Sequence, residues 1–181
     1  MTGHRASLDQ KRDHAWWAIA PVGAIDVAFE SPSVRFRGLG YHDANFGVEG
    51  LEEGFRSWNW SRASTATGAC LTYDAIDLAG NPTSATLSVN EHGELVPRAT
   101  PEMLAPRMLP RSSWGLSRFA RSEAPSFLRR SLEDGPFYAR ALIQTSHDRK
   151  VALAMHEVLD ATRLSKSWVR FLAPFRMGRA C

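Results

Sequence analysis

One short block of the chain, residues 38–47, concentrates polar side chains between glycines, and two tryptophans follow it. Its polar members and these tryptophans are His42, Asp43, Asn45, Trp58 and Trp60. The flanking glycines permit backbone angles that other residues avoid. An ordinary turn does not need this set of side chains, whereas a pocket that holds an apolar molecule with a few placed polar groups does. The block therefore predicts a pocket for an apolar substrate, with Asp43 as a candidate acid and His42 as a candidate base.

Three ordered segments of the chain carry a family resemblance. The first comprises residues 40–47, Leu51-Glu52 and residues 55–62 (Phe-Arg-Ser-Trp-Asn-Trp-Ser-Arg). The others are residues 132–140 (Leu-Glu-Asp-Gly-Pro-Phe-Tyr-Ala-Arg) and residues 172–177 (Leu-Ala-Pro-Phe-Arg-Met). They resemble the C-terminal part of the carotenoid 1,2-hydratase (hydroxyneurosporene synthase) family, whose members usually carry a further N-terminal domain. The resemblance implies a lipocalin-like barrel and an enzyme of carotenoid biosynthesis that adds water to the terminal C=C bond of an acyclic carotenoid.

Hydration of an isolated double bond needs no redox cofactor, so we expect neither a cofactor nor a metal. An acid protonates one carbon, and water captures the tertiary carbocation that forms. A carboxylic acid can do this only if it stays protonated near neutral pH, which burial against aromatic rings favours. Aromatic faces can stabilise the cation, and a histidine can orient the water or take its proton.

The chain supplies candidates for each role. The candidate catalytic residues are Asp43 and Asp74 as acids, His42 as base and Tyr73 beside Asp74. The candidate substrate-binding residues are Tyr41, Asn45, Phe46, Trp58 and Trp60. The resemblance implies a functional set with a His-x-Trp pair inside the glycine-bounded block and a tyrosine and an aspartate downstream. Ala44 and Phe46 stand at the positions of that pair, and Tyr73-Asp74 is the loose counterpart of the downstream residues.

Each candidate also has an ordinary structural interpretation. Asp43 and Asn45 can shape a turn, Trp58 and Trp60 at period two can pack across strands, and Asp74 can face solvent. A lipocalin-like protein that binds a carotenoid or another apolar isoprenoid without chemistry is therefore the alternative function. A cyclising or pericyclic reaction guided by pocket shape is a third. The remaining histidines lack metal-ligand spacing, which argues against a zinc site.

The elements that must position these residues are short β-like runs separated by turn residues. Three hairpins are expected. Their paired runs are residues 24–30 with 34–38, residues 69–78 with 84–90, and residues 137–146 with 151–159. Prolines in residues 97–110 exclude a long helix there. This pattern predicts an all-β barrel or sandwich with a short helical C-terminal tail. We divide the chain into a flexible N-terminal segment (1–15), a lipocalin-like β domain (16–162) and a basic-aromatic tail (163–181).

Composition limits the setting in which the protein works. A chain of 181 residues with 44% hydrophobic and 23% charged residues is typical of one soluble globular domain. Its net charge of +3 is low and no groove-binding motif occurs, so we expect no nucleic-acid partner. Two cysteines argue for a reducing compartment, and no apolar run reaches the ~20 residues of a membrane span. We expect a cytoplasmic protein that contacts the inner membrane peripherally through its tail, completed by an N-terminal domain or a second copy that covers apolar surface.

Overall fold

The computed structural model describes residues 2–97 and 104–172, and its regular structure is almost entirely β. The strands are β1 (Arg5–Ser7), β2 (His14–Phe29), β3 (Val34–Gly47), β4 (Phe55–Thr65), β5 (Gly68–Asp77), β6 (Pro82–Asn90), β7 (Ala105–Leu109), β8 (Arg118–Ser122), β9 (Phe127–Asp134), β10 (Tyr138–His147) and β11 (Lys150–Asp160). Two short α-helices, α1 (Leu51–Gly54) and α2 (Ser167–Leu172), and the 3-10 helix η1 (Ala161–Arg163) complete them. The all-β prediction is confirmed.

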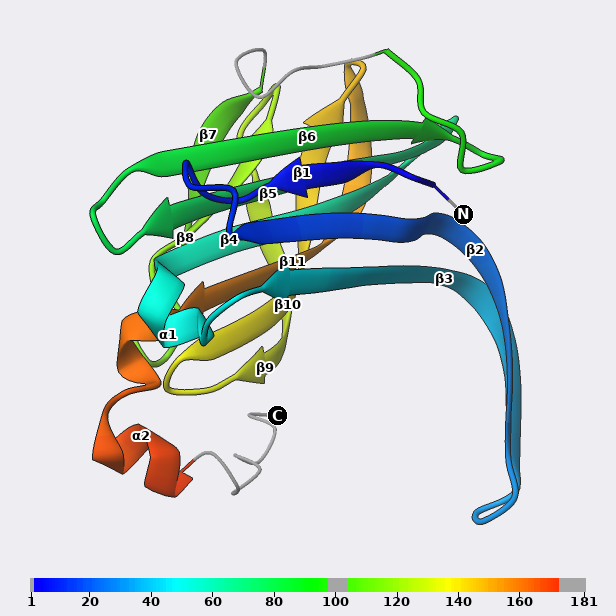
Figure 1. Ribbon diagram of the computed structural model, residues 1–181. Helices are drawn as coiled ribbons and strands as arrows, with labels where there is room; N and C mark the ends of the chain where they lie inside the picture. The colour runs from blue at the N-terminus through cyan, green and yellow to red at the C-terminus, as the bar shows by residue number, and fades with distance from the viewer. Residues whose placement is uncertain (1, 98–103, 173–181) are drawn as a thin grey trace.

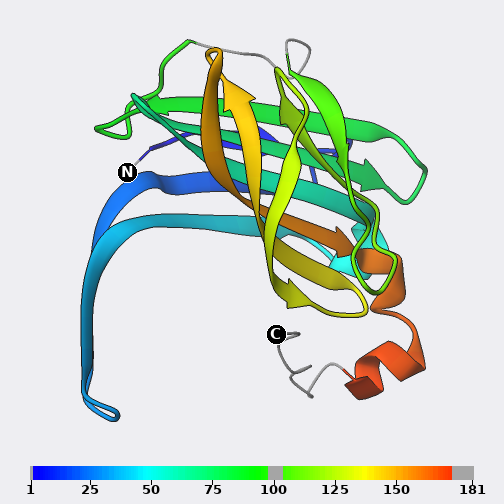
Figure 2. The same ribbon diagram turned by 180° about the vertical axis from the view of Figure 1, so that it is seen from behind.

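The strands form three antiparallel sheets, in the orders β1-β2-β3, β6-β5-β4-β11-β10-β9 and β7-β8. The first sheet lies over one face of the six-stranded sheet and β7-β8 lies over the other (Figures 1 and 2). The predicted barrel is wrong, because the sheets that the structure describes do not close on themselves. β2 and β3 pair with each other and β1 rather than with an edge of the large sheet, and their far ends leave the body.

All three predicted hairpins are present, as β2-β3, β5-β6 and β10-β11. The turn of the last hairpin is the tightest. Asp148 and Arg149 both have positive φ, 53° and 59°, while His147 and Lys150 pair on either side. Two consecutive left-handed residues make the turn whose twist matches the twist of the flanking strands. The turn residues therefore predicted the pairing of β10 with β11 correctly.

Strand alternation gives the six-stranded sheet two different faces. One face carries aromatic side chains, among them Trp58, Trp60 and Tyr73, and packs against the β1-β2-β3 sheet around the fully buried Trp16. The other face carries smaller and polar side chains such as Asn59 and packs against β7-β8. We call these the pocket face and the covered face.

The ends of the chain and the proline-rich connection differ from expectation. Residues 5–7 of the segment predicted to be flexible form β1, which pairs with β2 from Ser7↔Ala15 to Arg5↔Trp17. The proline-rich connection contains the strand β7, in which Pro106 pairs opposite Arg121 of β8. These two strands form a two-stranded sheet, so β7 is an edge strand, where a proline is tolerated. The predicted helical tail begins with η1 and α2, while residues 173–181 lie outside the described residues. No helix in the described parts is long and apolar enough to cross a membrane.

Candidate functional site

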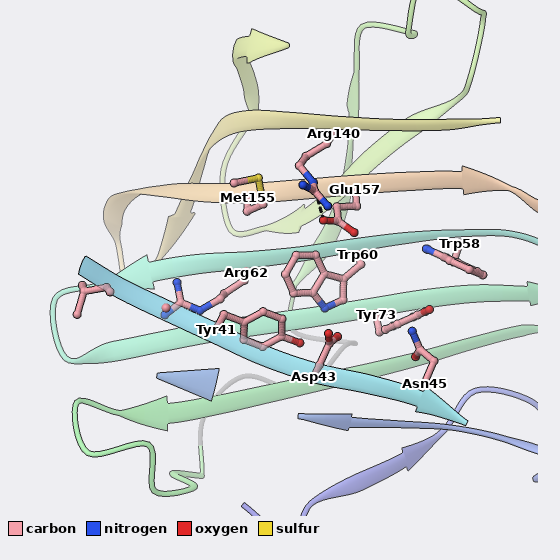
Figure 3. A pocket seen from close by; sticks show the side chains of 12 residues that line it. Tyr41, Asp43, Asn45, Trp58, Trp60, Arg62, Tyr73, Arg140, Met155 and Glu157 are labelled. Carbon is pink, nitrogen blue, oxygen red and sulfur yellow. Dashed lines mark hydrogen bonds and ion pairs between the residues drawn. The ribbon is translucent and has the colours of Figure 1, made fainter. Parts of the chain in front are cut away.

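A pocket of about 480 Å³ lies between β3 and the pocket face of the six-stranded sheet (Figure 3). It is lined by Leu39, Gly40, Tyr41, Asp43, Asn45, Trp58, Trp60, Arg62, Tyr73, Arg140, Met155 and Glu157. Six of the nine predicted site residues are among them: Tyr41, Asp43, Asn45, Trp58, Trp60 and Tyr73. These six come from three strands, so the fold gathers side chains that are distant in sequence.

Alternation along β3 decides which residues of the glycine-bounded block enter the pocket. Tyr41, Asp43 and Asn45 line it, while His42 lies between them on the opposite side of the strand and is exposed. Phe46 also lies outside the pocket, stacks on Trp17 at 6.2 Å between ring centroids and lines a smaller neighbouring cavity. The structure therefore does not bring the predicted base, His42, to the predicted acid, Asp43.

Asp43 accepts a hydrogen bond from one neutral donor and lies among aromatic rings. The indole Nε1–H of Trp16 donates to Asp43 Oδ2 at 2.8 Å, and Trp16 is completely buried. The Tyr41 hydroxyl points toward the same carboxyl group (Figure 3). Burial, and then the neighbouring Asp43, raise the pKa of Tyr41, so its phenol stays protonated. Within residues 2–97 and 104–172, Asp43 forms no ion pair with an arginine or a lysine.

Aromatic rings form the walls of the pocket around this acid. Tyr41 and Trp60 lie 5.1 Å apart between ring centroids, and Trp58 and Tyr73 lie 6.1 Å apart. Burial, followed by the charges of Asp43 and Glu157, raises the pKa of Tyr73, which is 2% exposed. Both tyrosines are therefore neutral rings at physiological pH, and the pocket presents electron-rich faces beside a carboxyl group.

The other predicted acid, Asp74, lies on the covered face, because it follows the pocket residue Tyr73 on the same strand. Arg121 of β8 forms an ion pair with Asp74 Oδ1 at 2.7 Å, and Ser84 of β6 donates a hydrogen bond to the same oxygen. Asp74 is thus a buried carboxylate matched by a cation, outside the pocket. Asp74 therefore does not reach the pocket in which a substrate would be protonated.

An ion pair in the pocket was missed from the sequence. Arg140 of β10 and Glu157 of β11 pair in register, and Arg140 Nε donates to Glu157 Oε1 at 2.9 Å and to the Tyr138 hydroxyl at 2.9 Å. Arg140 is the last residue of the segment 132–140 that carries the resemblance. It lies in a strand whose side chains alternate in burial, and this alternation was the sequence signal that could have placed it in the pocket. Arg62 and Met155 line the pocket as well; Arg62 donates through Nε to the Pro21 carbonyl at 2.9 Å.

A buried histidine next to the pocket was also missed. His14 of β2 donates through Nδ1 to Asp9 Oδ2 at 2.6 Å, and its buried Nε2 has no hydrogen-bond partner among the described residues. His14 lines a cavity of about 50 Å³ that shares Asn45, Trp58 and Tyr73 with the large pocket. In the neutral imidazole, donation from Nδ1 to Asp9 makes the buried Nε2 a hydrogen-bond acceptor.

The signal for this histidine was the triplet His14-Ala15-Trp16. Residues two apart on a strand share a face, and both side chains are buried here. The resemblance implies a His-x-Trp pair inside the glycine-bounded block, and a second triplet of this type lies on the neighbouring strand, where Trp16 pairs opposite Asn45. Among the described residues, no three His, Cys, Asp or Glu side chains converge in a way that could hold a metal ion.

Comparisons with known proteins agree with the resemblance. The family model "Carotenoid hydratase CrtC" matches residues 1–181. The acyclic carotenoid 1,2-hydratase of Thiocapsa roseopersicina is 37% identical over 175 residues, which cover 96% of this chain and 43% of that protein. The enzyme of the same name from Rhodobacter capsulatus is 31% identical, over 99% of this chain and 63% of its own length. The chain thus spans roughly half the length of these curated relatives, and matches their C-terminal part.

A solved structure also shares the fold. The crystal structure of a candidate AttH protein from Nitrosomonas europaea superimposes with a TM-score of 0.52 at 11% identity, over 82% of this chain and 52% of that one. At this identity the likeness concerns the arrangement of strands alone.

Proposed function

We propose that this chain, which belongs to the carotenoid hydratase CrtC family, adds water to the terminal C=C bond of an acyclic carotenoid in the pocket beneath β3. One observation carries the proposal: the pocket holds a carboxyl group, Asp43, that is bonded to the neutral donor Trp16 and surrounded by aromatic rings. The names of the relatives, acyclic carotenoid 1,2-hydratases, supply the substrate class.

Asp43 is the proton donor in this proposal. Trp16 fixes Oδ2 through its indole N–H, so Oδ1 carries the proton toward the substrate. The electron pair of the C=C bond forms the new C–H bond, and the neighbouring carbon becomes a tertiary carbocation. The phenol of Tyr41, kept neutral by its raised pKa, supports the carboxylate that remains.

The aromatic walls stabilise the cation and the apolar chain. Trp58, Trp60 and Tyr73 present their faces to the pocket, and a cation over such a face is stabilised by about 0.5–2 kcal/mol per ring. The positive charges of the two arginines that line the pocket, Arg62 and Arg140, repel the carbocation only weakly. Arg140 is paired with Glu157, and the Nε–H group of Arg62 is directed to the Pro21 carbonyl.

His14 is the base that accepts a proton from the attacking water. A cavity of about 50 Å³ accommodates an ordered water, for which one probe volume of about 10–15 Å³ suffices. The water oxygen donates an electron pair to the cationic carbon, and His14 Nε2 accepts its proton while Asp9 stabilises the imidazolium. His14 and Trp16 form a His-x-Trp pair with Tyr41 and Asp43 downstream of it. These residue types match the set that the resemblance implies, but the pair lies outside the glycine-bounded block where the resemblance places it.

Incubation with lycopene or neurosporene in detergent, in water enriched in heavy oxygen, tests the proposal by mass spectrometry. We expect a hydroxylated product that carries the label. A polyene that co-purifies unchanged would instead favour the alternative, a carotenoid-binding protein without chemistry. That alternative gains weight from Ala44 and Phe46, which stand where the resemblance places a histidine and a tryptophan.

A further inference from the structure

One buried indole N–H group in the pocket lacks an acceptor. Trp60 of β4 is 6% exposed, and its Nε1 atom is buried without a hydrogen-bond partner among the described residues. The indole N–H is a donor only, so an acceptor atom of a molecule bound in the pocket must satisfy it. Trp60 lines the pocket, and Figure 3 shows its nitrogen turned toward Tyr41 and Asp43. Because a hydrocarbon chain offers no acceptor, this group indicates a ligand that carries oxygen close to Asp43.

The Tyr41 hydroxyl is a second donor at the same place. It is also buried without a hydrogen-bond partner among the residues that the structure describes, and its ring lies 5.1 Å from the Trp60 ring between centroids. Burial raises the pKa of this phenol, Asp43 raises it further, and the nearby N–H groups of Trp16 and Trp60 lower it in part. The phenol therefore keeps its proton at neutral pH. Asp43 and Trp60 lie near its oxygen, but neither is aligned for a hydrogen bond with it.

The two donors and the carboxyl group surround one point of the pocket. The Trp16 indole occupies Asp43 Oδ2 at 2.8 Å, so Oδ1 is the oxygen that can serve a ligand. A ligand oxygen at this point can accept hydrogen bonds from Trp60 and Tyr41 and a proton from Asp43. Neutral donors aimed at an oxygen that gains negative charge lower the barrier to breaking the bond between that oxygen and carbon.

The water of the hydration reaction lies in a different place. The cavity of about 50 Å³ beside His14 adjoins the pocket, but neither Trp60 nor Tyr41 lines it. In Figure 3, Tyr41 lies on one side of Asp43, and Asn45, which the cavity shares with the pocket, lies on the other. An oxygen bound to the Trp60 N–H and a water beside His14 therefore approach a ligand from different sides.

We propose that Trp60 Nε1–H and the Tyr41 hydroxyl form a subsite for an epoxide oxygen, and that the pocket also opens terminal epoxides of acyclic isoprenoids to vicinal diols. A terminal epoxide places one oxygen on the two carbons that form the C=C bond of the unoxidised chain end. Back-side opening requires the leaving oxygen and the attacking water on opposite sides of the carbon that is attacked. The roles of Asp43 and His14 in this step rest on the proposed function, whereas the contact of Trp60 with oxygen does not.

The step balances with water as the co-reactant. Asp43 transfers its proton to the epoxide oxygen while the bond from that oxygen to the tertiary carbon breaks, and the electron pair of the bond stays on the oxygen. The Trp60 and Tyr41 donors stabilise this oxygen as charge develops on it. Water beside His14 forms the new C–O bond, and His14 Nε2 takes the proton that the water loses. Return of a proton from the imidazolium to the Asp43 carboxylate through solvent restores the site.

Squalene that carries one terminal epoxide tests the activity, because it has the same branched chain end as an acyclic carotenoid. The full chain is incubated with this epoxide in detergent, in water enriched in heavy oxygen. We expect a vicinal diol with the label on the tertiary carbon, where acid-assisted opening directs the water. Mass-spectrometric fragmentation between the two hydroxylated carbons locates the label. A diol that forms no faster than without protein, or a label on the other carbon, would overturn the proposal without recourse to any variant.

Trp60→Phe tests the subsite, since it keeps an aromatic ring and removes the N–H. Loss of one neutral hydrogen bond to a ligand corresponds to about a fivefold change. The ratio of epoxide turnover to carotenoid turnover should therefore fall about fivefold. Trp17→Phe is the matched control and should leave the ratio unchanged, because the Trp17 indole donates to the Thr2 carbonyl outside the pocket. An unchanged ratio in Trp60→Phe would overturn the subsite.

The two activities can fail separately. A wild type that hydrates the carotenoid but leaves the epoxide intact would overturn this inference and leave the proposed function standing. A wild type that opens the epoxide but does not hydrate the carotenoid would overturn the proposed function and support this inference. In that case kcat/KM for the epoxide, compared between Trp60→Phe and Trp17→Phe, replaces the ratio as the test of the subsite.

Discussion

The two aspartates that the sequence nominated lie on opposite sides of one sheet, and their surroundings differ in kind. Asp74, on the covered face, is paired with Arg121 at 2.7 Å and accepts a hydrogen bond from Ser84. Asp43, above the pocket face, accepts the Trp16 N–H at 2.8 Å and lies beside Tyr41. A carboxylate paired with a buried cation links neighbouring strands and sheets. A carboxyl group beside one neutral donor and aromatic rings instead lines the pocket where a substrate would lie.

The same contrast extends to the other polar side chains of the covered face. Asn59 Oδ1 accepts the Phe119 N–H at 3.1 Å, and His156 Nε2 donates to the Phe119 carbonyl at 2.9 Å. These bonds fasten β8 to the large sheet, so the polar groups there serve packing. On the pocket face, the buried Nε1 of Trp60 has no hydrogen-bond partner among the described residues. The groups that bond to Phe119 therefore hold the fold together, and Trp60 Nε1 is available to a ligand in the pocket. Among the described residues, His156 Nδ1 on the covered face also lacks a hydrogen-bond partner, but it lies outside the pocket.

Asp43→Asn should show the largest effect, because the amide cannot donate the proton that starts the reaction. General acid catalysis contributes about 10²–10⁴-fold, so we expect hydration to fall roughly a thousandfold. Binding of the polyene, followed by its absorption spectrum, and the thermal midpoint should stay near wild type. Hydration at more than a tenth of the wild-type rate would remove Asp43 from the role of acid.

Asp74→Asn should reverse this pattern. The substitution removes the carboxylate that Arg121 pairs with at 2.7 Å in a largely buried site, and breaking such a pair lowers the free energy of unfolding by about 3–5 kcal/mol. Urea denaturation measures the loss. Turnover of the protein that remains folded should match wild type, and Ser84→Ala, which removes only a neutral donor, is the milder control. A stable but inactive variant would contradict the division of roles.

His156 makes the covered face sensitive to acid. Burial lowers the pKa of this imidazole to about 4, against about 6.5 in the unfolded chain. The unfolded state binds the proton first as pH falls, so stability is complete above about 6.5, declines from there to about pH 4, and loses roughly 3 kcal/mol in total. His156→Gln keeps a donor to the Phe119 carbonyl and should flatten this part of the unfolding free energy against pH. An unchanged pH profile would exclude His156 as its source.

Trp16→Phe should produce the smallest effect. The ring is retained, but the N–H bond to Asp43 is lost, and a hydrogen bond to a carboxyl group is worth about 1–1.5 kcal/mol. We therefore expect about a tenfold drop in kcat with KM for the polyene little changed. Trp17→Phe is the matched control, since the indole of Trp17 donates to the Thr2 carbonyl rather than into the site. Equal effects of the two substitutions would show that the Trp16 indole does not position Asp43.

Local patterns predicted much of the fold and part of the site. Turn residues located the three hairpins, and period-two spacing placed Trp58 and Trp60 on one face, where both line the pocket. The same period also predicts that neighbours such as His42 and Asp43, or Tyr73 and Asp74, point to opposite sides. The sequence did not say which member of each pair faces the pocket, because that depends on the layer each strand packs against.

The remaining differences arise from contacts between residues distant in the chain. Trp16 and Asp43 meet across β2 and β3, and Arg121 reaches Asp74 from another sheet. No local signal specifies such pairs. Barrel closure is likewise a property of how whole sheets meet, and residues 24–39 of β2 and β3 form an extension rather than a closing edge.

Transfer of heavy oxygen from water to an acyclic carotenoid, measured side by side for wild type, Asp43→Asn and Asp74→Asn, tests the central claim most directly. The account predicts labelled product from wild type and from the folded fraction of Asp74→Asn, and a roughly thousandfold loss for Asp43→Asn. Labelled product from Asp43→Asn at the wild-type rate, together with its loss in a fully folded Asp74→Asn, would contradict the account and move the acid to the covered face.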